Sequence, residues 1–425
     1  MTRKLKETNI DWIGEVPENW EISTIGSHYT ERTDKVSDLD YIPLSVTKSG
    51  IVPQLEIAAK SSNHDNRKLV LKDDFVINSR SDRKMSAGIS SIDGSVSVIN
   101  TVLYSNTIDR NYTKYLLKNY AFAEEFYKWG TGIVDDLWST KWLKMKNIPI
   151  PVPSSEKQKQ IGSVIDSMVQ NTNNIINGTK ESISELKKYK QSLITESVTK
   201  GIDQNVEMKD SGIKWIGKIP LNWNVRKIKH DFNLKGRIGW QGLTSKEHQE
   251  KGPHLITGTD FKNGIIDWDS CVRISEERFK EAPEIHIKEN DLLITKDGTI
   301  GKVSLAINVP KKVSLNSGVL LIREKSNSSI NKKFMYYNLL SNMFWNWYNS
   351  NDQGSSTIRH LYQGQFYNYS YASPPLNKQE QIVQYLDGKV TTIDNLIENK
   401  TKVIEELENY KKSLIYEYVT GKKEV

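Results

Sequence analysis

An internal repeat constrains the fold of this chain more than any other feature of its 425 residues. The motif W-I-G-x-V-P-x-N-W at 12–20 returns at 215–223 with isoleucine in place of valine, an offset of 203 positions. A longer segment, 157–199, returns at 378–420 with 19 identities over 43 ungapped positions, an offset of 221. This agreement indicates a duplication, so the chain alternates variable blocks with repeated ones. Each of the two units is the size of a domain, which argues against a solenoid of short repeats.

Both copies of the longer segment have the periodicity of a helix with one apolar stripe. Spacings that alternate between 3 and 4 residues predict a heptad-like seam. The expected members of this seam are Ile165, Met168, Ile175, Leu186, Tyr189 and Leu193 in the first copy, and Leu386, Ile393, Leu396, Leu407, Tyr410 and Leu414 in the second. Prolines precede each copy, and Gly201 and Gly421 follow, where a left-handed residue commonly ends a helix.

A helix of this length needs a partner for its apolar stripe. At 1.5 Å per residue it is roughly 65 Å long, which exceeds the diameter of a domain of this size. The obvious partner is the other copy, and because a globular block separates the two copies, we expect an antiparallel pair. This pair would have one block at each end and an approximate two-fold axis. The alternative is two independent helices, each in the core of its own domain; their length and likeness favour the pair.

The variable blocks, 12–155 and 215–376, predict a mixed α+β fold for the chain. Short apolar runs predict strands at 75–77, 96–99, 292–294 and 319–322, and helical patterns cover 115–127 and 332–347. Basic residues gather in loops between these strands. Because arginine and lysine bind phosphate or guanine, and glutamine binds adenine, such loops are candidate DNA contacts. The candidates are Ser79, Arg80, Arg83, Lys84, Lys235, Arg237, Trp240, Gln241, Lys296, Thr299, Lys302, Arg359 and His360.

Composition permits a nucleic-acid partner. The 59 Lys and Arg exceed the 52 Asp and Glu, which leaves a net charge of +7. This small positive charge is compatible with DNA binding but does not by itself predict it. A single cysteine, Cys271, excludes a disulfide framework within the chain. The N-terminal residues lack the apolar core of a signal peptide, and no apolar run is long enough to predict a membrane span.

Motifs for catalysis are missing from the sequence. Ser373-Pro374-Pro375-Leu376 resembles a motif of amino-methyltransferases, but the aromatic residue that would stack on a flipped base is replaced by leucine. No glycine-rich phosphate loop occurs, and histidine and cysteine are not spaced as metal ligands. Asp291 and Lys296 are at most a loose fragment of a nuclease pattern. We therefore expect a non-catalytic recognition protein with no cofactor or metal of its own.

This pattern resembles the specificity (S) subunits of type I restriction–modification systems over essentially the whole chain. The resemblance rests on the repeated W-I-G-x-x-P-x-N-W opening and on the repeated K-Q-x-Q-I helix ending in Y-K-x-S-L-I-x-E-x-V-T. KGRIGWQGL at 235–243 and DLLITKDGTIGKV at 291–303 add to it. One departure is at 154–156, where the family often has a P-P-L-x-E-Q run.

The resemblance implies target-recognition domains at 1–155 and 201–376, with spacer helices at 156–200 and 377–425. Each domain would read one half of a split, asymmetric site in double-stranded DNA. The helices would set the spacing and dock two methyltransferase subunits that carry S-adenosylmethionine, with two restriction subunits that use ATP and Mg in the larger complex. A bacterial or archaeal cytoplasm is implied. The alternatives are a recognition chain with its own methyltransferase or nuclease activity, and a protein-only coiled-coil scaffold.

Overall fold

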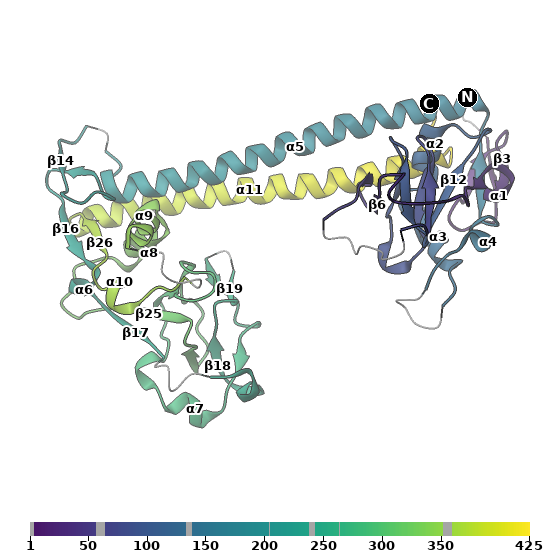
Figure 1. The fold of residues 1–425 in the computed structure, drawn as a ribbon. Helices are drawn as coiled ribbons and strands as arrows, with labels where there is room; N and C mark the ends of the chain where they lie inside the picture. Colours follow the sequence, from purple (N-terminus) through teal and green to yellow (C-terminus); the bar gives the residue numbers. More distant parts are fainter. Residues whose placement is uncertain are drawn as a thin grey trace. The chain divides into compact units, whose positions relative to one another are not determined.

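The computed structural model describes residues 4–56, 64–132, 138–203, 205–237, 243–262, 264–351 and 359–425 (Figure 1). Two units result, one formed by Met1–Lys180 with Lys400–Val425 and the other by Glu181–Asn399. Each long helix is therefore shared between the units. In the described part of the chain, no helix is both long and apolar enough to cross a membrane.

The first unit joins small antiparallel sheets to short helices. Its strands are β1 (Leu5–Glu7), β2 (Glu15–Pro17), β3 (Glu21–Thr24), β4 (Thr30–Glu31), β5 (Lys35–Val36), β6 (Leu44–Thr47), β7 (Gly50–Pro53), β8 (Arg67–Val70), β9 (Phe75–Asn78), β10 (Ala87–Ile89), β11 (Gly94–Ser97), β12 (Asn100–Tyr104) and β13 (Pro149–Val152). Its helices are α1 (Ile25–His28), α2 (Arg110–Leu116), α3 (Tyr120–Lys128) and α4 (Trp142–Met145), with a 3₁₀ turn at Ser81–Arg83.

The second unit repeats this plan. Its strands are β14 (Met208–Asp210), β15 (Lys218–Pro220), β16 (Asn224–Lys227), β17 (Phe232–Gly236), β18 (Gln249–Ile256), β19 (Phe261–Lys262), β20 (Ile265–Ile266), β21 (Val272–Arg273), β22 (Leu292–Thr295), β23 (Val303–Leu305), β24 (Val313–Leu315), β25 (Val319–Glu324) and β26 (Ser370–Ser373). Its helices are α6 (Ile228–Asp231), α7 (Glu276–Lys280), α8 (Lys332–Leu340), α9 (Asn342–Asn351) and α10 (Gln363–Phe366), with 3₁₀ turns at Ser245–Glu247 and Pro283–Ile285.

The central sheets of the two units have the same strand order although their sequences differ. The order is β10-β9-β12-β4 in the first unit and β23-β22-β25-β17 in the second. The predicted strands at 75–77, 292–294 and 319–322 fall in these sheets. The run 96–99 is only half correct, because β11 ends at Ser97 and the two apolar residues after it are in a turn, 38% and 41% exposed. The duplication therefore extends through the variable blocks although their sequences share little.

Two predicted helices are each divided in two. The pattern at 115–127 is interrupted because Asn119 accepts a hydrogen bond from the Phe122 amide (2.9 Å) and so begins a new helix, α3. The pattern at 332–347 is interrupted at Ser341, whose hydroxyl donates back to the carbonyl of Asn338 (2.6 Å). Side-chain capping therefore overrides the apolar periodicity in both blocks.

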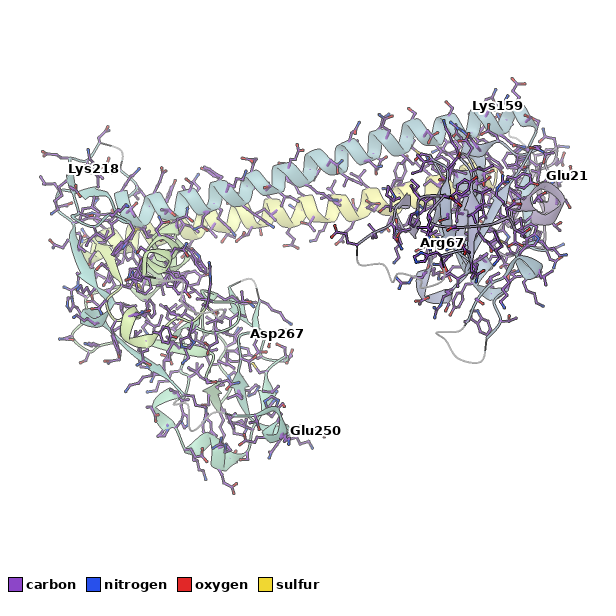
Figure 2. The ribbon with its side chains drawn as sticks, in the orientation of Figure 1. Glu21, Arg67, Lys159, Lys218, Glu250 and Asp267 are labelled. Carbon is purple, nitrogen blue, oxygen red and sulfur yellow. The ribbon has the colours of Figure 1, made fainter. Side chains whose placement is uncertain are left out.

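The long helices, α5 (Ser155–Lys200) and α11 (Leu376–Val419), form the predicted antiparallel pair. In the first unit Lys411 Nζ donates to Asn173 Oδ1 (2.9 Å), and in the second Lys190 Nζ contacts Asp394 Oδ1 (2.5 Å). The two contacts are equivalent, because Lys190 and Lys411, like Asn173 and Asp394, are 221 positions apart. Side chains project from both helices along their length, and Lys159 on α5 is one of them (Figure 2).

The seam between the helices differs from the predicted one at every second position. Its buried and half-buried members are Ile165, Val169, Thr172, Ile176, Thr179, Ile183, Leu186, Lys190 and Leu193 on α5, and Leu386, Val390, Ile393, Ile397, Lys400, Ile404, Leu407, Lys411 and Leu414 on α11. The heptad period is kept, but the spacing from Ile165 or Leu386 begins with 4 rather than 3. Met168 is half-buried beside Val169.

Four predicted seam residues instead face solvent. Ile175 and Tyr189 are each 55% exposed, Leu396 is 45% exposed and Tyr410 is 54% exposed. Neighbouring apolar pairs such as Ile175-Ile176 allow the seam to be assigned in two ways from sequence. Packing selects the series richer in valine and isoleucine, because it buries more apolar surface.

The repeated short motif fastens each block to the end of a long helix. Trp12 Nε1 donates to the carbonyl of Pro149 (3.1 Å), and Trp215 Nε1 donates to the carbonyl of Ser370 (3.5 Å). The two acceptors are again 221 positions apart. Trp20 packs with the end of α11 in the core of the first unit, and Trp223 packs with the end of α5 in that of the second. The short motif therefore has a structural role.

The glycines that end the helices lie in tight contact with this motif. Gly421 has φ +72°, and a Cβ placed there would lie 2.6 Å from Pro17 Cδ and 2.9 Å from the Trp20 ring. We expect Gly421→Ala to destabilise the first unit by about 1–2 kcal/mol for the left-handed backbone and by about 1–3 kcal/mol more for overpacking. Calorimetric unfolding measures the loss.

Gly217→Ala is the matched control for this substitution. Gly217 has the same φ of +72°, but no atom lies within 4 Å of a Cβ placed there. Its substitution should incur only the backbone cost. Equal losses for the two variants would show that the contact between Gly421 and the repeated motif does not matter for stability.

Candidate nucleic-acid interface

The first basic run (79–84) lies in the loop that follows β9, an inner strand of the central sheet of the first unit. Ser79 is buried, and its hydroxyl donates to the carbonyl of Ile99 (2.5 Å), which holds the start of the loop. The side chains of Arg80 and Arg83 are 40% and 65% exposed and flank Asp82 at 3.6 and 3.3 Å. Two guanidinium groups are thus presented to solvent, with one carboxylate between them.

Lys84 ends this loop and is held by the helix opposite. Its ammonium pairs with Glu124 and lies 5.6–5.7 Å from the ring centres of Tyr120 and Tyr127, within the range of a cation–π contact. The hydrogen bond from Lys84 lowers the pKa of Glu124, so this carboxylate is charged at neutral pH. Lys84 thus anchors the loop; a direct contact between Lys84 and DNA stays a prediction.

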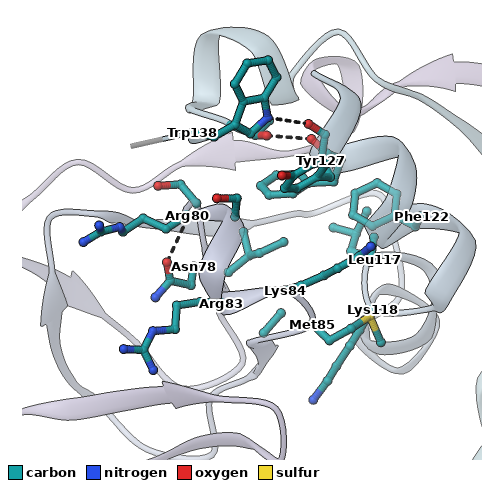
Figure 3. A pocket seen from close by; sticks show the side chains of 17 residues that line it. Asn78, Arg80, Arg83, Lys84, Met85, Leu117, Lys118, Phe122, Tyr127 and Trp138 are labelled. Carbon is teal, nitrogen blue, oxygen red and sulfur yellow. Dashed lines mark hydrogen bonds between the residues drawn. The ribbon is translucent and has the colours of Figure 1, made fainter. Parts of the chain in front are cut away.

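The loop covers a small cavity, shown in Figure 3. Its volume is about 20 Å³, which is room for one water molecule. Asn78 and Arg80 lie at one side, Phe122 and Tyr127 at the other. A nucleobase does not fit in such a space, so any DNA contact must be made on the surface of the loop.

In the second unit, the loop after β22 carries the run 296–302. Lys302 Nζ donates to the carbonyl of Gly258 (3.0 Å), Thr299 is exposed, and Lys296 is half-buried. Asp297 pairs with His360, whose ring centre lies 4.5 Å from that of Tyr362. The basic runs 296–302 and 359–360 are therefore neighbours in the fold although they are far apart in the sequence.

The same two-loop arrangement occurs in both units. The Leu361 amide donates to the Lys296 carbonyl (2.9 Å), and the Thr140 amide donates to the Ser79 carbonyl (2.9 Å). Thr140 and Leu361 are 221 positions apart, the offset of the long helices. Each loop after the central strand is thus tied to a second loop, 138–140 or 359–361. Residues 138–140 were not predicted; mapping Arg359 and His360 back by 221 positions would have found them.

Arg237, from the second basic run (235–241), is enclosed. It is 3% exposed, and its Nε donates to the Leu315 carbonyl (2.8 Å) while Nη2 donates to Ser314 Oγ (3.0 Å). Burial lowers the pKa of this guanidinium, and the charge of Arg278 lowers it further. Arg237 therefore holds β24 in place rather than lying on an open loop.

Arg67 in the first unit, labelled in Figure 2, makes the same kind of contact. Its Nε donates to Ser95 Oγ (2.8 Å) on β11. Of the other members of the second basic run, Lys235 is exposed, and Trp240 and Gln241 lie outside the described residues. As DNA contacts, all of these residues stay predictions.

The loose nuclease fragment has a structural explanation. Asp291 is buried, accepts a hydrogen bond from the Lys288 amide (2.7 Å) and pairs with Arg323. Asp74 does the same in the first unit, with the Leu71 amide (2.8 Å) and Arg32 (2.7 Å). Over the described ranges, no group of three or more acidic, histidine or cysteine side chains is placed to hold a metal ion.

Comparison with known proteins now identifies the family. Residues 17–185 and 220–409 match the family model of the type I restriction modification DNA specificity domain. The chain belongs to this family. Each matched segment covers one variable block and most of the long helix that follows it, and the protein is a specificity subunit whose role is DNA sequence recognition.

Curated relatives of this specificity subunit include two proteins from Methanocaldococcus jannaschii. One is the type I restriction enzyme MjaVIII specificity subunit, 26% identical over 281 residues, or 65% of this chain and 62% of the relative. The other is the putative type I restriction enzyme MjaX specificity subunit, 23% identical over 433 residues, which cover 96% of this chain and 95% of the relative. The second alignment includes both blocks and both helices.

Solved structures share the fold. A chain from a structure described as explaining complex assembly and conformational transition of the type I R-M system matches with a TM-score of 0.72 at 15% identity, over 95% of this chain and 98% of the other. The HsdS subunit from Thermoanaerobacter tengcongensis matches with a TM-score of 0.54 at 14% identity, over 96% and 98%. The specificity-subunit fold is thus kept although most side chains differ.

Proposed function

We propose that this specificity subunit reads an asymmetric, bipartite site in double-stranded DNA, one half-site with each recognition domain (1–155 and 201–376). The supporting observation is the equivalent tie between two loops in each unit, Ser79 with Thr140 and Lys296 with Leu361. Equivalent scaffolds that carry different side chains are suited to reading different sequences. The two half-sites are therefore expected to differ.

The chemistry of these loops suits base and phosphate contacts. Arg80 and Arg83 are solvent-facing guanidinium groups, and arginine binds the O6 and N7 atoms of guanine in a bidentate manner. In the second unit, exposed Thr299 and Arg359 lie on the paired loops. Hydroxyl and guanidinium donors of this kind contact base edges or phosphates.

Docking of partner subunits is proposed for the outer stripe, which consists of Ile175 and Tyr189 on α5 and Leu396, Val403 and Tyr410 on α11. These side chains are 44–55% exposed. Ile175 and Leu396, like Tyr189 and Tyr410, are 221 positions apart, so each helix presents an equivalent apolar face. Exposed apolar faces of this kind mark protein contacts, and two equivalent faces suit two copies of one partner.

The partners that fit this arrangement are two methyltransferase subunits on the spacer helices (156–200 and 377–425), joined by two restriction subunits in the larger complex. The methyltransferase would supply S-adenosylmethionine, and the restriction subunit would use ATP and Mg. This chain then contributes recognition and assembly without catalysis of its own. Its place of action would be the cytoplasm of a bacterium or archaeon.

The loop proposal is tested with the double variant Arg80→Ala/Arg83→Ala in the complex with its methyltransferase. Loss of a guanine contact costs about 1–3 kcal/mol, so discrimination at one half-site should fall by one to two orders of magnitude. Methylome sequencing of cells that carry the variant would show relaxed bases in one half-site and an unchanged second half.

Lys187→Ala/Lys412→Ala is the charge-matched control, because both lysines are exposed on the long helices and outside the paired loops. It should leave both half-sites unchanged. Relaxation of both halves by the loop variant, or methylation of one continuous site by the wild-type complex, would contradict the proposal.

A further inference from the structure

A basic groove occurs in the first unit at the junction of the recognition block and the helix pair. Its volume is about 920 Å³, and it is lined from the block by Lys48, Lys72, Arg110, Lys114 and Lys118 and from the helices by Asn173 and Lys411. We name it the junction groove. Asp73 and Glu408 are the acidic residues among the groove's lining side chains, so positive charge predominates.

Part of this charge is already neutralised. Arg110 pairs with Asp73, Lys114 with Asp166 (2.7 Å) and Lys411 with Glu408 (2.7 Å). Among the described residues, the ammonium groups of Lys48, Lys72 and Lys118 form no ion pair with a carboxylate. Lys118 is half-buried, and its pKa is lowered, first by burial and then by the neighbouring charge of Lys114. The groove therefore has uncompensated cations that an anion would stabilise.

The junction groove adjoins the reading loop. Lys118 lines both this groove and the small cavity beneath residues 79–84, where it lies with Arg83 and Lys84 (Figure 3). Cationic side chains therefore continue from the loop to the helix pair without leaving the first unit. The repeat of such charges along a surface is the footprint expected for a phosphodiester backbone.

The remaining lining favours phosphate over an acidic protein segment. Ser49, Ser91 and Asn111 supply neutral donors of the kind that contact DNA phosphates. Ile89, Val169 and Ile415 are the aliphatic side chains here, and all three pack against the core of the unit. Because these three are already partly buried in that core, charged and polar side chains make up most of the lining, which suits phosphate better than a protein partner that needs an apolar anchor.

The equivalent surface of the second unit has different chemistry. The helix caps Asp109 and Asn331 align the two blocks, because the amide of each donates to a glutamine (Gln158 or Gln379) at 2.7 Å. By this alignment Tyr336 replaces Lys114 and Leu340 replaces Lys118.

On the helix pair, Asp394 replaces Asn173 and its carboxylate pairs with Lys190. The scaffold is thus shared by the two units, but at these aligned positions the described residues of the second unit carry no uncompensated positive charge.

We propose that the junction groove binds phosphates of the DNA backbone beside the half-site read by the first unit. This inference rests on the proposed function, because it assigns a sequence-independent contact to the same DNA. The two domains would then differ in their phosphate contacts as well as in the bases that they recognise. The first domain holds its side of the site through extra phosphates, whereas the second depends more on its loops.

The test compares Lys48→Gln/Lys72→Gln/Lys118→Gln with the control Lys159→Gln/Lys187→Gln/Lys412→Gln, three exposed helix lysines. Binding of the full chain is measured by fluorescence anisotropy over a range of salt concentrations. The probes are a 40-base-pair duplex of random sequence and one containing the methylated motif. Each phosphate contact contributes about 0.9 to the slope of log K against log salt, so the groove variant should lose about 2–3 from that slope.

The groove variant should weaken binding to both duplexes by the same factor, leaving their ratio unchanged. Phosphate-ethylation interference on wild-type protein should mark phosphates beside one half-site only. The double variant Lys48→Gln/Lys72→Gln, at exposed positions, repeats the test should the triple variant unfold. Lysine-to-arginine substitutions at the same positions should restore the slope.

A groove variant with the same slope as the control set overturns the inference. An unchanged slope with weaker capture of the methyltransferase would overturn it in favour of an acidic protein segment. Failure of the proposed function looks different: wild-type protein would bind both duplexes equally, while the slope on the random duplex would still report on the groove.

Discussion

Replacing residues 25–148 with the corresponding block of another family member is expected to change one half-site of the methylated DNA motif completely and leave the other intact. The exchange keeps the β3–β13 pair, the repeated motif at 12–20 and the long helices, so the packing of this motif against the end of α11 remains. The incoming block must supply its own contacts in place of Asp109 with Gln158 and Lys114 with Asp166. Because specific binding exceeds non-specific binding by about 10³–10⁷, the old half-site should no longer be methylated at a detectable level.

The reciprocal exchange, of residues 228–369, keeps the equivalent β16–β26 pair and should change only the second half-site. Genome-wide detection of methylated adenine in cells that carry each chimera gives both results directly. The distance between the half-sites should be the same in both chimeras, since neither helix is altered. A chimera that changes both halves would show that the two domains do not read DNA independently.

Ile176→Asp is expected to disrupt the first unit, whereas the neighbouring Ile175→Asp should not. Ile176 is 2% exposed in the helix seam, and Ile175 is 55% exposed on the outer stripe. An aspartate at 176 would bury an unpaired charge and lose the packing of a β-branched side chain, with an expected cost above about 3 kcal/mol. Chemical denaturation of the two variants measures the difference.

The same pair of variants separates folding from assembly. Ile175→Asp should keep the wild-type unfolding midpoint yet reduce co-purification of the methyltransferase, because it places a charge on the proposed docking face. Full assembly with this variant would move the docking surface away from the outer stripe. Equal stability of the two variants would contradict the observed register of the seam.

The main features of the long helices are predictable from the sequence. The repeat alone predicted two helices, their antiparallel pairing and their glycine ends, and Gly201 and Gly421 have the expected left-handed φ of +82° and +72°. A heptad repeat of apolar residues predicts a helix, and it also predicts a second helix that covers the apolar stripe. The order of the spacings does not follow, since Ile175-Ile176 and Leu396-Ile397 satisfy either order until a partner surface selects one.

Local capping limited the prediction of the shorter helices. Asn119 and Ser341 lie inside apolar patterns, and polar residues of this kind can either continue a helix or bond to the backbone and interrupt it. The structure shows that their side chains bond to the backbone and start new helices. Competition of this kind depends on the direction in which the next helix must run, which tertiary packing decides.

The candidate interface was only partly accessible to sequence reasoning. Basic loop residues such as Arg83 could be named from composition, but not the exposure that sets it apart from the enclosed Arg237. Residues 138–140 carry no basic run and went unpredicted, because their link to the loop is a backbone hydrogen bond, which any sequence can form.

The sequence by itself determined the architecture of this protein, because a duplicated heptad segment of this length has few ways to bury its apolar stripe. It also determined the family, through motifs used twice. Only the tertiary structure decided which isoleucine of each pair is buried, which arginine is presented to solvent and which loop lies beside which. These outcomes depend on contacts between residues far apart in the chain, such as Thr140 with Ser79, and no local pattern encodes them.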